Sequence, residues 1–149
     1  MDVAAILKTK SCPVYTVLVD QTVDDAIHLM DAKKVEALIV VDAQRPVGIF
    51  TRRDVFRYYL LPGKEALTDV KLKRAMTDQL ISAGSGDDIA DIIAMMIKSD
   101  LDHLPVIEDD NILGLLALKD LVKIQLESLT GEIHHLNDYI DDLHEAGQD

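Results

Sequence analysis

The sequence predicts an α/β (α+β) fold in which two β-α-β-β-α units pack about a pseudo-twofold axis and a long amphipathic helix follows. Three observations lead to this prediction. Much of the chain occurs twice at a constant offset, each copy alternates apolar strands with amphipathic helices, and the last part carries a heptad pattern. Because neither unit can cover its own apolar sheet face alone, we expect the two units to share one core.

The internal repeat has an offset of 66 residues (114 − 48 = 66) and runs without a gap. It is clearest in residues 48–54 and 114–120, where an apolar strand with a glycine leads into a helix with an aspartate in its first turn. Identical pairs include Asp25/Asp91, Ile27/Ile93, Met30/Met96, Leu38/Leu104, Val40/Val106, Gly48/Gly114 and Asp54/Asp120. This similarity indicates two copies of one supersecondary unit. Chance similarity between two α/β segments is the alternative.

The apolar periodicity and the turn residues place the elements of the first unit. We expect a helix over 3–8, a strand over 14–17, a helix opened by Thr22 and Asp25, strands over 37–41 and 47–50, and a helix over 53–61. Thr22 and Asp25 form an acidic variant of the capping box. The apolar stripe of that helix is Val23, Ala26, Ile27 and Met30.

The second unit is expected to repeat this order. We expect a helix over 72–76, an opening strand over 79–82, a helix with Ile89, Ile92, Ile93 and Met96 on its buried face, and strands over 104–107 and 112–116. The predicted domain organisation is therefore a first repeat at 1–62, a linker at 63–71, a second repeat at 72–126 and a coiled-coil-like helix at 127–149.

Composition narrows the classes of function. With 149 residues, 48% of them hydrophobic, the chain can bury one substantial core. No apolar run approaches the roughly 18 residues of a membrane span, and the first residues lack the basic start of a signal peptide, so we expect a cytoplasmic protein without membrane contact. The net charge of −12 argues against nucleic acid as a partner. Cys12 is the only cysteine, which excludes an internal disulfide.

The tail carries a sustained heptad pattern. Its apolar residues recur at alternating spacings of 4 and 3, namely Val122, Leu126, Leu129, Ile133, Leu136, Ile140 and Leu143. Ile at two of three a positions and Leu at three of four d positions favour a two-stranded pairing and hence a homodimer. The acids fall outside this seam, at Glu127, Asp138, Asp141, Asp142 and Glu145. Only Gly131 weakens the helix, and packing of the stripe on the chain's own body is the alternative.

These residues resemble a known family, the tandem pair of CBS domains, regulatory modules named after cystathionine beta-synthase, of the stand-alone bacterial type. The resemblance covers residues 3–126. It rests on Thr22-Val23-Asp24-Asp25-Ala26, on His103-Leu104-Pro105-Val106-Ile107, and on the Gly-x-x-Thr/Ser-x-x-Asp signature at Gly48, Thr51 and Asp54. It implies regulation rather than catalysis. It also implies an adenine nucleotide or adenosyl compound as regulatory ligand, AMP or ATP foremost, with no required cofactor.

The resemblance implies that each ligand cleft is assembled across the two repeats. The residues expected in the first cleft are Thr51, Arg52, Arg53, Asp54, Ile81, Leu101, His103 and Leu104. An aspartate can accept both ribose hydroxyls, a threonine at a helix N-terminus can meet a phosphate, apolar side chains can sandwich a purine, and Arg and His can pair with phosphate. The alternatives are that Thr51 and Asp54 only cap a helix and that His103 is structural.

A second, weaker cleft is expected from Tyr15, Val35, Glu36, Ala37, Lys119 and Asp120. It departs from the family pattern because Ala117 replaces the hydroxyl residue and Glu36 puts a negative charge where phosphates lie. With only Lys119 to compensate, we expect this cleft to be empty, weak, or selective for a ligand with little phosphate charge. Asp102 is a further departure, since relatives often have a basic residue there, and it limits the phosphates that the first cleft tolerates.

An enzymatic function finds little support in the sequence. There is no phosphate-binding glycine loop with a lysine, and no Ser/His/Asp or Cys/His arrangement. His134, His135 and Asp138 are residue types that bind metals, but adjacent helix residues point about 100° apart, so we expect no metal site. The prediction is a nucleotide sensor that acts on a separate protein or on its own assembly. The competing interpretation is a ligand-independent dimerisation or docking scaffold.

Overall fold

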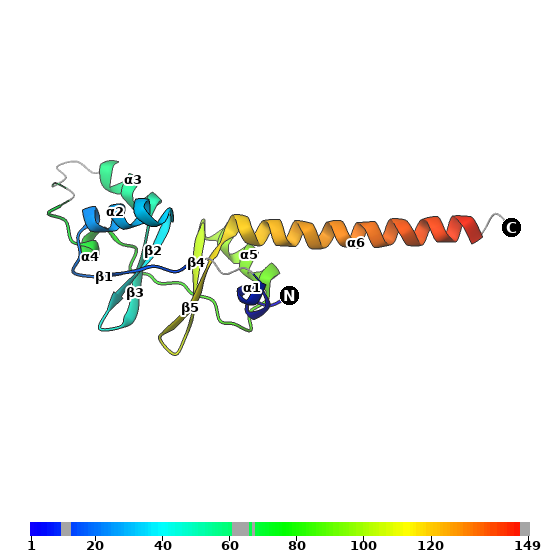
Figure 1. Ribbon diagram of the computed structural model, residues 1–149, viewed down its shortest axis with the longest axis horizontal. Coiled ribbons are helices and arrows are strands. Elements are labelled where there is room, and N and C mark those ends of the chain that lie inside the picture. The colour runs from blue at the N-terminus through cyan, green and yellow to red at the C-terminus, as the bar shows by residue number, and fades with distance from the viewer. Residues whose placement is uncertain (10–12, 61–65, 67, 147–149) are drawn as a thin grey trace.

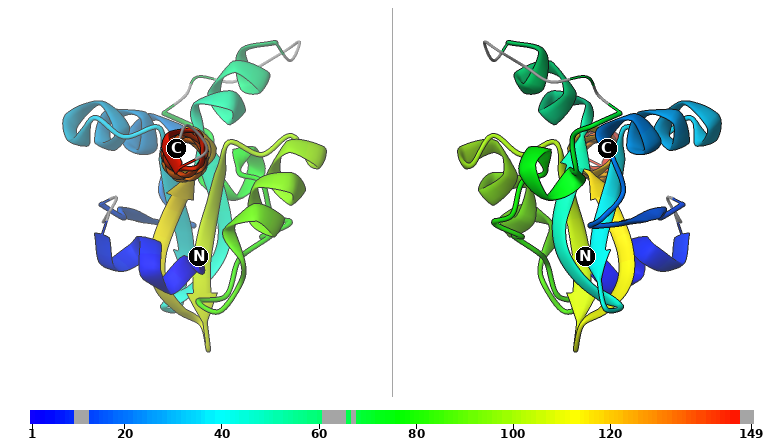
Figure 2. Two further views of the ribbon diagram at one scale, coloured as in Figure 1. Left: turned by 90° about the vertical axis from the view of Figure 1, so that its right-hand side faces the viewer. Right: turned by 90° about the vertical axis from the view of Figure 1, so that its left-hand side faces the viewer.

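The computed structural model of the chain describes residues 1–9, 13–60, 66 and 68–146. Two small sheets with their helices form a body, and one long helix extends from it (Figure 1). In the views along this helix, the strands of both sheets lie in the centre, with the helices around them (Figure 2). The predicted end of one helix at residue 61, four residues of the predicted linker (63–65 and 67), and Cys12 lie outside the described residues.

The order of elements follows the predicted repeat. The first half contains α1 (Val3–Thr9), β1 (Thr16–Leu18), α2 (Val23–Lys33), β2 (Ala37–Asp42), β3 (Arg45–Thr51) and α3 (Arg52–Leu60). The second contains α4 (Leu72–Ala75), α5 (Ile89–Lys98), β4 (His103–Glu108), β5 (Asn111–Ala117) and α6 (Leu118–Ala146). The predicted capping box is confirmed, because Thr22 accepts a hydrogen bond from the Asp25 N–H and the Asp25 carboxylate accepts one from the Thr22 N–H.

The two sheets share their local geometry. In the first sheet β1 runs parallel to β2, which pairs antiparallel with β3; in the second, β4 pairs antiparallel with β5. Both hairpins have a register shift at the same repeat position, between Val40 and Val41 and between Val106 and Ile107. Both turn through two residues with positive φ, at 43–44 and 109–110.

The predicted opening strand over 79–82 is wrong. The structure has a single bridge there, between Ala83 and Val106. In the first sheet the Ile39 N–H donates to the Tyr15 carbonyl at 3.1 Å. The equivalent of Ile39 is Pro105, which has no N–H to donate, so the pairing shrinks to the hydrogen bonds of Ala83.

Each repeat takes its first helix from the other half of the chain. Val3 and Ile6 of α1 lie in the core of the second repeat, whereas Val70 and Leu72 lie in the core of the first. Backbone hydrogen bonds hold both exchanges: the Val3 N–H donates to the Asp87 carbonyl at 3.0 Å and the Leu72 N–H to the Gln21 carbonyl at 2.8 Å. The two halves are therefore interlocked as well as stacked.

The two signature glycines make this exchange possible. A Cβ atom on Gly48 would lie 2.8 Å from the sulfur of Met76 and from the carbonyl oxygen of Thr77. A Cβ atom on Gly114 would lie 2.5 Å from a methyl carbon of Leu7. Each glycine thus leaves room for the segment that the other half contributes.

The tail is one helix with the end of the second repeat. Helix α6 runs without a break through the predicted boundary at residue 126. Leu121 is buried in the body, and Leu118 and Ile124 pack against the same core. From Leu126 onward the described side chains of the stripe are exposed, so the alternative that the stripe packs on its own body is wrong. Among the described residues no helix is both long and apolar enough to cross a membrane.

Candidate functional site

A cleft of about 370 Å³ lies between the two repeats, at the N-terminus of α3. The first repeat contributes Thr51, Arg52 and Arg53, and the second contributes Leu101 from the loop that leads into β4 and His103 from the start of that strand. The structure therefore brings together five of the eight residues predicted for the first cleft. The other lining residues are Ile49, Arg57, Thr77, Ser99, Asp100 and Asp102.

Ion pairs hold the arginines of this cleft. One guanidinium nitrogen of Arg53 donates to the Asp100 carbonyl at 2.6 Å, and the other donates to the Asp102 carboxylate at 2.8 Å. Arg52 donates to the Glu36 carboxylate at 2.9 Å. Two arginines that could bind phosphate are thus paired with carboxylates of the chain itself, and the Arg53 contacts join the two repeats.

Asp54 is buried, with 2% of its surface exposed. Its carboxylate accepts hydrogen bonds from the Thr51 N–H at 2.9 Å and from the Thr77 hydroxyl at 3.0 Å, and it forms an ion pair with Arg57. In this state Asp54 caps α3. It lines an adjoining hollow of about 610 Å³ rather than the first cleft, although Arg57 and Thr77 line both.

The remaining two predicted residues lie elsewhere. Leu104 is fully buried in the core of the second repeat, and the Ile81 side chain is partly exposed without lining the first cleft.

A second cleft of about 280 Å³ lies at the N-terminus of α6. Val35, Glu36, Ala37 and Lys119 line it as predicted. Its other lining residues are Pro13, Lys33, Lys34, His103, Leu115 and Ala117. Asp120 does not line it, and Tyr15 lies beside it, with the Lys33 amine 5.5 Å from the centre of its ring.

The charge predicted for the second cleft needs correction. The sequence interpretation counted Lys119 as the only compensation for Glu36, but Lys33 and Lys34 also line this cleft. Moreover, the Glu36 carboxylate is bound by Arg52. The second cleft therefore has a more cationic lining than the sequence interpretation allowed.

His103 stands between the two clefts. It lines both of them. It also lines a hollow of about 450 Å³, together with Arg52 and Asp102 of the first cleft and Glu36 and Lys119 of the second. Burial lowers the pKa of His103, the carboxylates of Glu36 and Asp102 act to raise it, and Arg52 and Lys119 act to lower it. The net effect is a pKa below the ordinary histidine value, which favours the neutral ring.

The signature glycines, the capped helices and the positions that line the clefts all occur twice, once in each half of the chain. The family model of the CBS domain matches residues 3–61 and again residues 69–127. The chain belongs to the CBS-domain family.

Solved structures of other CBS proteins share the fold of this pair. A protein with CBS domains from Burkholderia ambifaria MC40-6 is 32% identical, with a TM-score of 0.78 over 85% of this chain and 95% of that chain. A CBS-domain containing protein from Agrobacterium tumefaciens is 26% identical, with a TM-score of 0.76 over 84% of this chain and 99% of that chain.

Curated relatives include stand-alone CBS proteins and parts of larger ones. The CBS domain-containing protein YhcV of Bacillus subtilis is 27% identical over 84% of this chain and 88% of its own length. The mitochondrial CBS domain-containing protein CBSX3 of Arabidopsis thaliana is 30% identical over 81% of this chain. The chain spans 61% of the CBSX3 sequence and 21% of a matching inosine-5'-monophosphate dehydrogenase from Methanocaldococcus jannaschii.

The lining residues that sequence reasoning missed could have been found from the CBS repeat itself. The predicted windows before the strands were 35–37 and 101–103, which are equivalent at the offset of 66. Extending both windows by two residues adds Lys33 and Lys34 on one side and Ser99 and Asp100 on the other. No comparable signal marks Arg57 or Thr77, because their places depend on the packing of α3 and α4.

Proposed function

We propose that this CBS pair is a regulatory sensor of adenine nucleotides rather than an enzyme. The observation that carries the proposal is the first cleft, which combines Thr51, Arg52 and Arg53 of one repeat with Leu101 and His103 of the other. A ligand there contacts both repeats at once. The N-terminus of α3 adds a partial positive charge that suits a phosphate.

The chemistry of a related structure supports an adenosine ligand. The CBS domain pair of protein MJ0100 was solved in complex with 5'-methylthioadenosine and S-adenosyl-L-methionine. It shares the fold of this chain, with a TM-score of 0.73 at 20% identity. In the present chain Leu101 and Ile49 offer apolar surface for a purine. Asp54 can accept ribose hydroxyls after the side chains of Arg57 and Thr77 move away from its carboxylate.

The pairing of the arginines bears on the number of phosphates. A phosphate in the first cleft competes with Asp100 and Asp102 for Arg53. We therefore place AMP ahead of ATP for this cleft. The second cleft, with Lys33, Lys34 and Lys119, suits the more highly charged ligand.

We propose that ligand binding changes the position of α6 and that this change is the regulatory signal. The first residue of α6, Leu118, donates its N–H to the Asp102 carbonyl at 2.9 Å, and the equivalent Arg52 N–H donates to the Glu36 carbonyl at 3.2 Å. A ligand at either helix start biases the angle between the repeats and hence the direction of α6. Identical positions of α6 in crystals grown with and without nucleotide would contradict this step.

The tail is proposed to pair two copies of the chain into a homodimer. Its apolar stripe is exposed from Leu126 to Leu143. An isolated helix of this kind is marginal in water, so the stripe calls for a partner. The dimer, or a separate protein bound to it, is the regulated element; contacts between the CBS faces of two copies are a further means of pairing.

A thermal-shift screen tests the sensor. Purified protein is melted with AMP, ADP, ATP, NAD, NADH, S-adenosylmethionine and GTP, each at about 100 times its Kd where known. Occupancy at that ratio adds about 2.7 kcal/mol to the free energy of unfolding. This corresponds to roughly 5–10 °C in Tm for a chain of this size.

Two variants locate the site. Asp54→Ala is expected to lose the shift with adenine compounds. Asp25→Ala removes a comparable cap far from the clefts, so it lowers the unliganded Tm but keeps the shift. A dimeric protein that shows no shift with any of these compounds would instead favour the ligand-independent scaffold, for which the exposed stripe of α6 is the specific observation.

A further inference from the structure

The free part of α6 has no cover in the described structure. The helix leaves the body after Ile124, and Figure 1 shows it extending far beyond both sheets. At 1.5 Å per residue, the stripe from Val122 to Leu143 is about 32 Å long. Its leucines and isoleucines are about half exposed, which is the surface that a second helix covers in a two-stranded pair.

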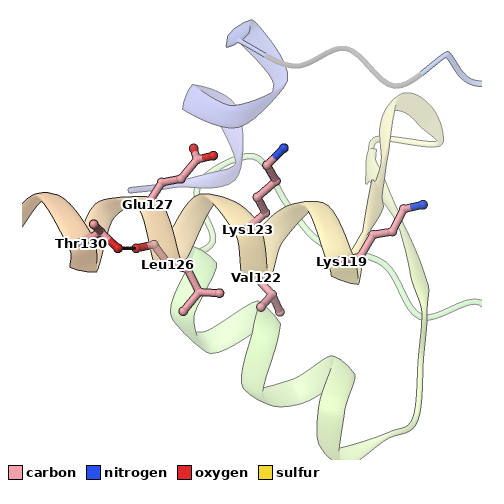
Figure 3. Close-up of a pocket in the computed structure, with 6 residues that line it drawn as sticks. All are labelled: Lys119, Val122, Lys123, Leu126, Glu127 and Thr130. Atoms are coloured by element: carbon pink, nitrogen blue, oxygen red, sulfur yellow. Dashed lines mark hydrogen bonds between the residues drawn. The ribbon is translucent and has the colours of Figure 1, made fainter.

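The root of this helix offers a groove. Lys119, Val122, Lys123, Leu126, Glu127 and Thr130 line a hollow of about 430 Å³. Val122 and Leu126 project from one side of the helix, and Lys123 and Glu127 from the other (Figure 3). All six residues belong to α6, so this groove is an open face of one helix, in which apolar side chains lie beside two lysines and Glu127.

The charges of α6 are segregated along its length. Lys119 and Lys123, both at the root, are the only Lys or Arg residues between 118 and 146. Asp138, Asp141 and Asp142 lie near the far end, where the helix dipole is also negative. The root also carries Asp120 and Glu127, so its charges balance, whereas the far end of the helix is anionic.

We infer that the tails of two copies pair antiparallel, so that the end of each tail docks in the root groove of the other. This inference rests on the tail pairing proposed above and adds its direction. The apolar layers then join Leu126 to the partner's Leu143, Leu129 to the partner's Ile140, and Ile133 to the partner's Leu136, which matches a to d positions throughout.

Charge decides between the two directions. A parallel pair brings the acids of both tails together at one end and leaves the lysines roughly 23–35 Å away, far beyond the Debye length of about 8 Å at physiological ionic strength. In the antiparallel register above, Asp138, Asp141 and Asp142 lie opposite the partner's Gly131, Ser128 and Glu127, about one to two helical turns from its Lys123, and the acidic ends of the two tails are far apart. An antiparallel pair also opposes the two helix dipoles.

Cysteine cross-linking tests the direction. In a Cys12→Ser background, Leu126→Cys and Leu143→Cys variants of the full chain are oxidised separately and after mixing. An antiparallel pair gives covalent dimers only in the mixture, because two cysteines introduced at position 126 lie about 26 Å apart and a disulfide needs Cβ atoms about 3.8 Å apart. Covalent dimers in each separate sample would establish a parallel pair and overturn the inference.

Sedimentation separates the pairing from its direction. The wild type is expected to be a dimer, which Ile133→Glu splits into monomers and which the matched exposed variant His135→Glu leaves intact. A wild-type monomer, or a dimer that resists Ile133→Glu, would overturn the tail pairing itself. Added salt provides a second readout of direction: it weakens an antiparallel pair, whereas it strengthens a parallel pair by screening the clustered acids. None of these results depends on nucleotide binding.

Discussion

The two clefts are built from equivalent positions of the two CBS repeats, yet their charges differ. Where the second cleft has Lys33 and Lys34, the first has Ser99 and Asp100. Arg53 in the first cleft is held by carboxylates. The acid of the second, Glu36, is bound by an arginine of the first.

This difference shows what duplication preserves in the pair. The backbone frame of the clefts is copied, including the glycines, the hairpin turns and the helix starts. The charged side chains that line the clefts are free to diverge, because they are exposed and contribute little to the core. Ligand preference should therefore be set separately in each cleft, and variants can test the two independently.

The largest expected effect is a difference in protein stability between alanine variants of the two signature aspartates, Asp54 and Asp120. Asp54→Ala leaves the Thr51 N–H and the Thr77 hydroxyl without their acceptor, and we expect a loss of about 2 kcal/mol. For a chain of this size this lowers Tm by roughly 4–8 °C. Asp120→Ala, at the equivalent and less buried position, is the control and should cost less. Equal losses of stability in Asp54→Ala and Asp120→Ala, measured by thermal unfolding, would show that the two aspartates do not differ in this role.

The next effect concerns phosphate in the second cleft. Lys33→Glu combined with Lys34→Glu reverses two charges of its lining, and we expect ATP to bind about tenfold more weakly while adenosine is unaffected. Titration calorimetry measures both ligands. Lys8→Glu with Lys73→Glu changes the net charge equally at exposed sites outside either cleft. A similar loss in that control would trace the effect to overall charge.

A smaller gain is expected in the first cleft. Asp100→Asn with Asp102→Asn releases Arg53 from both carboxylates, so ATP should bind a few times more tightly. Asparagine suits the positive φ of 55° at residue 100. Asp109→Asn with Asp110→Asn removes the same charge from the distant hairpin turn and should leave binding unchanged. Unaltered ATP affinity in the first variant would show that those acids do not compete with phosphate.

The smallest effect is a pH dependence shared by both clefts. Because the pKa of His103 is lowered in the folded state, its contribution to stability is present above the ordinary histidine value of about 6.5 and is lost as the pH falls through the lowered value. His103→Gln should remove this loss. His28, whose pKa is raised mainly by the Asp24 backbone carbonyl, contributes in the opposite direction, so its stabilisation fades as the pH rises. Urea unfolding of His103→Gln and of His28→Gln across this pH range measures the two opposite pH dependences of stability.

The sequence predicted the fold well because the repeat supplies each element twice. Strand β2 and strand β4 were identified by similar apolar runs, and the starts of α3 and α6 by the signature that ends in Asp54 and Asp120. The opening strand over 79–82 was the exception. Its own sequence pattern does not show that the neighbouring strand carries Pro105, which has no N–H to donate to it.

The candidate site was predictable only in part. Thr51, Arg52 and Arg53 were found because they lie within the repeated signature, and Leu101 and His103 because the family resemblance implies that the other repeat completes the cleft. Their partners were not, because the pairing of Arg53 with Asp100 and Asp102 depends on how the loop between α5 and β4, 47 to 49 residues away in sequence, meets the start of α3 in space. The capping role of Asp54 was one of two interpretations of the sequence, and its hydrogen bonds to Thr51 and Thr77 fit that role.

The exchange of first helices has a consequence for synthesis on the ribosome. The core of the first repeat is incomplete until Val70 and Leu72 have emerged from the ribosome. Helix α1 can pack only after the strands of the second repeat, some hundred residues later, have been synthesised. The chain therefore gains its stability late, in one cooperative step. A gene fragment encoding a single repeat would lack a helix that it needs, and its product could complete itself only by borrowing that helix from another molecule, as a domain-swapped oligomer.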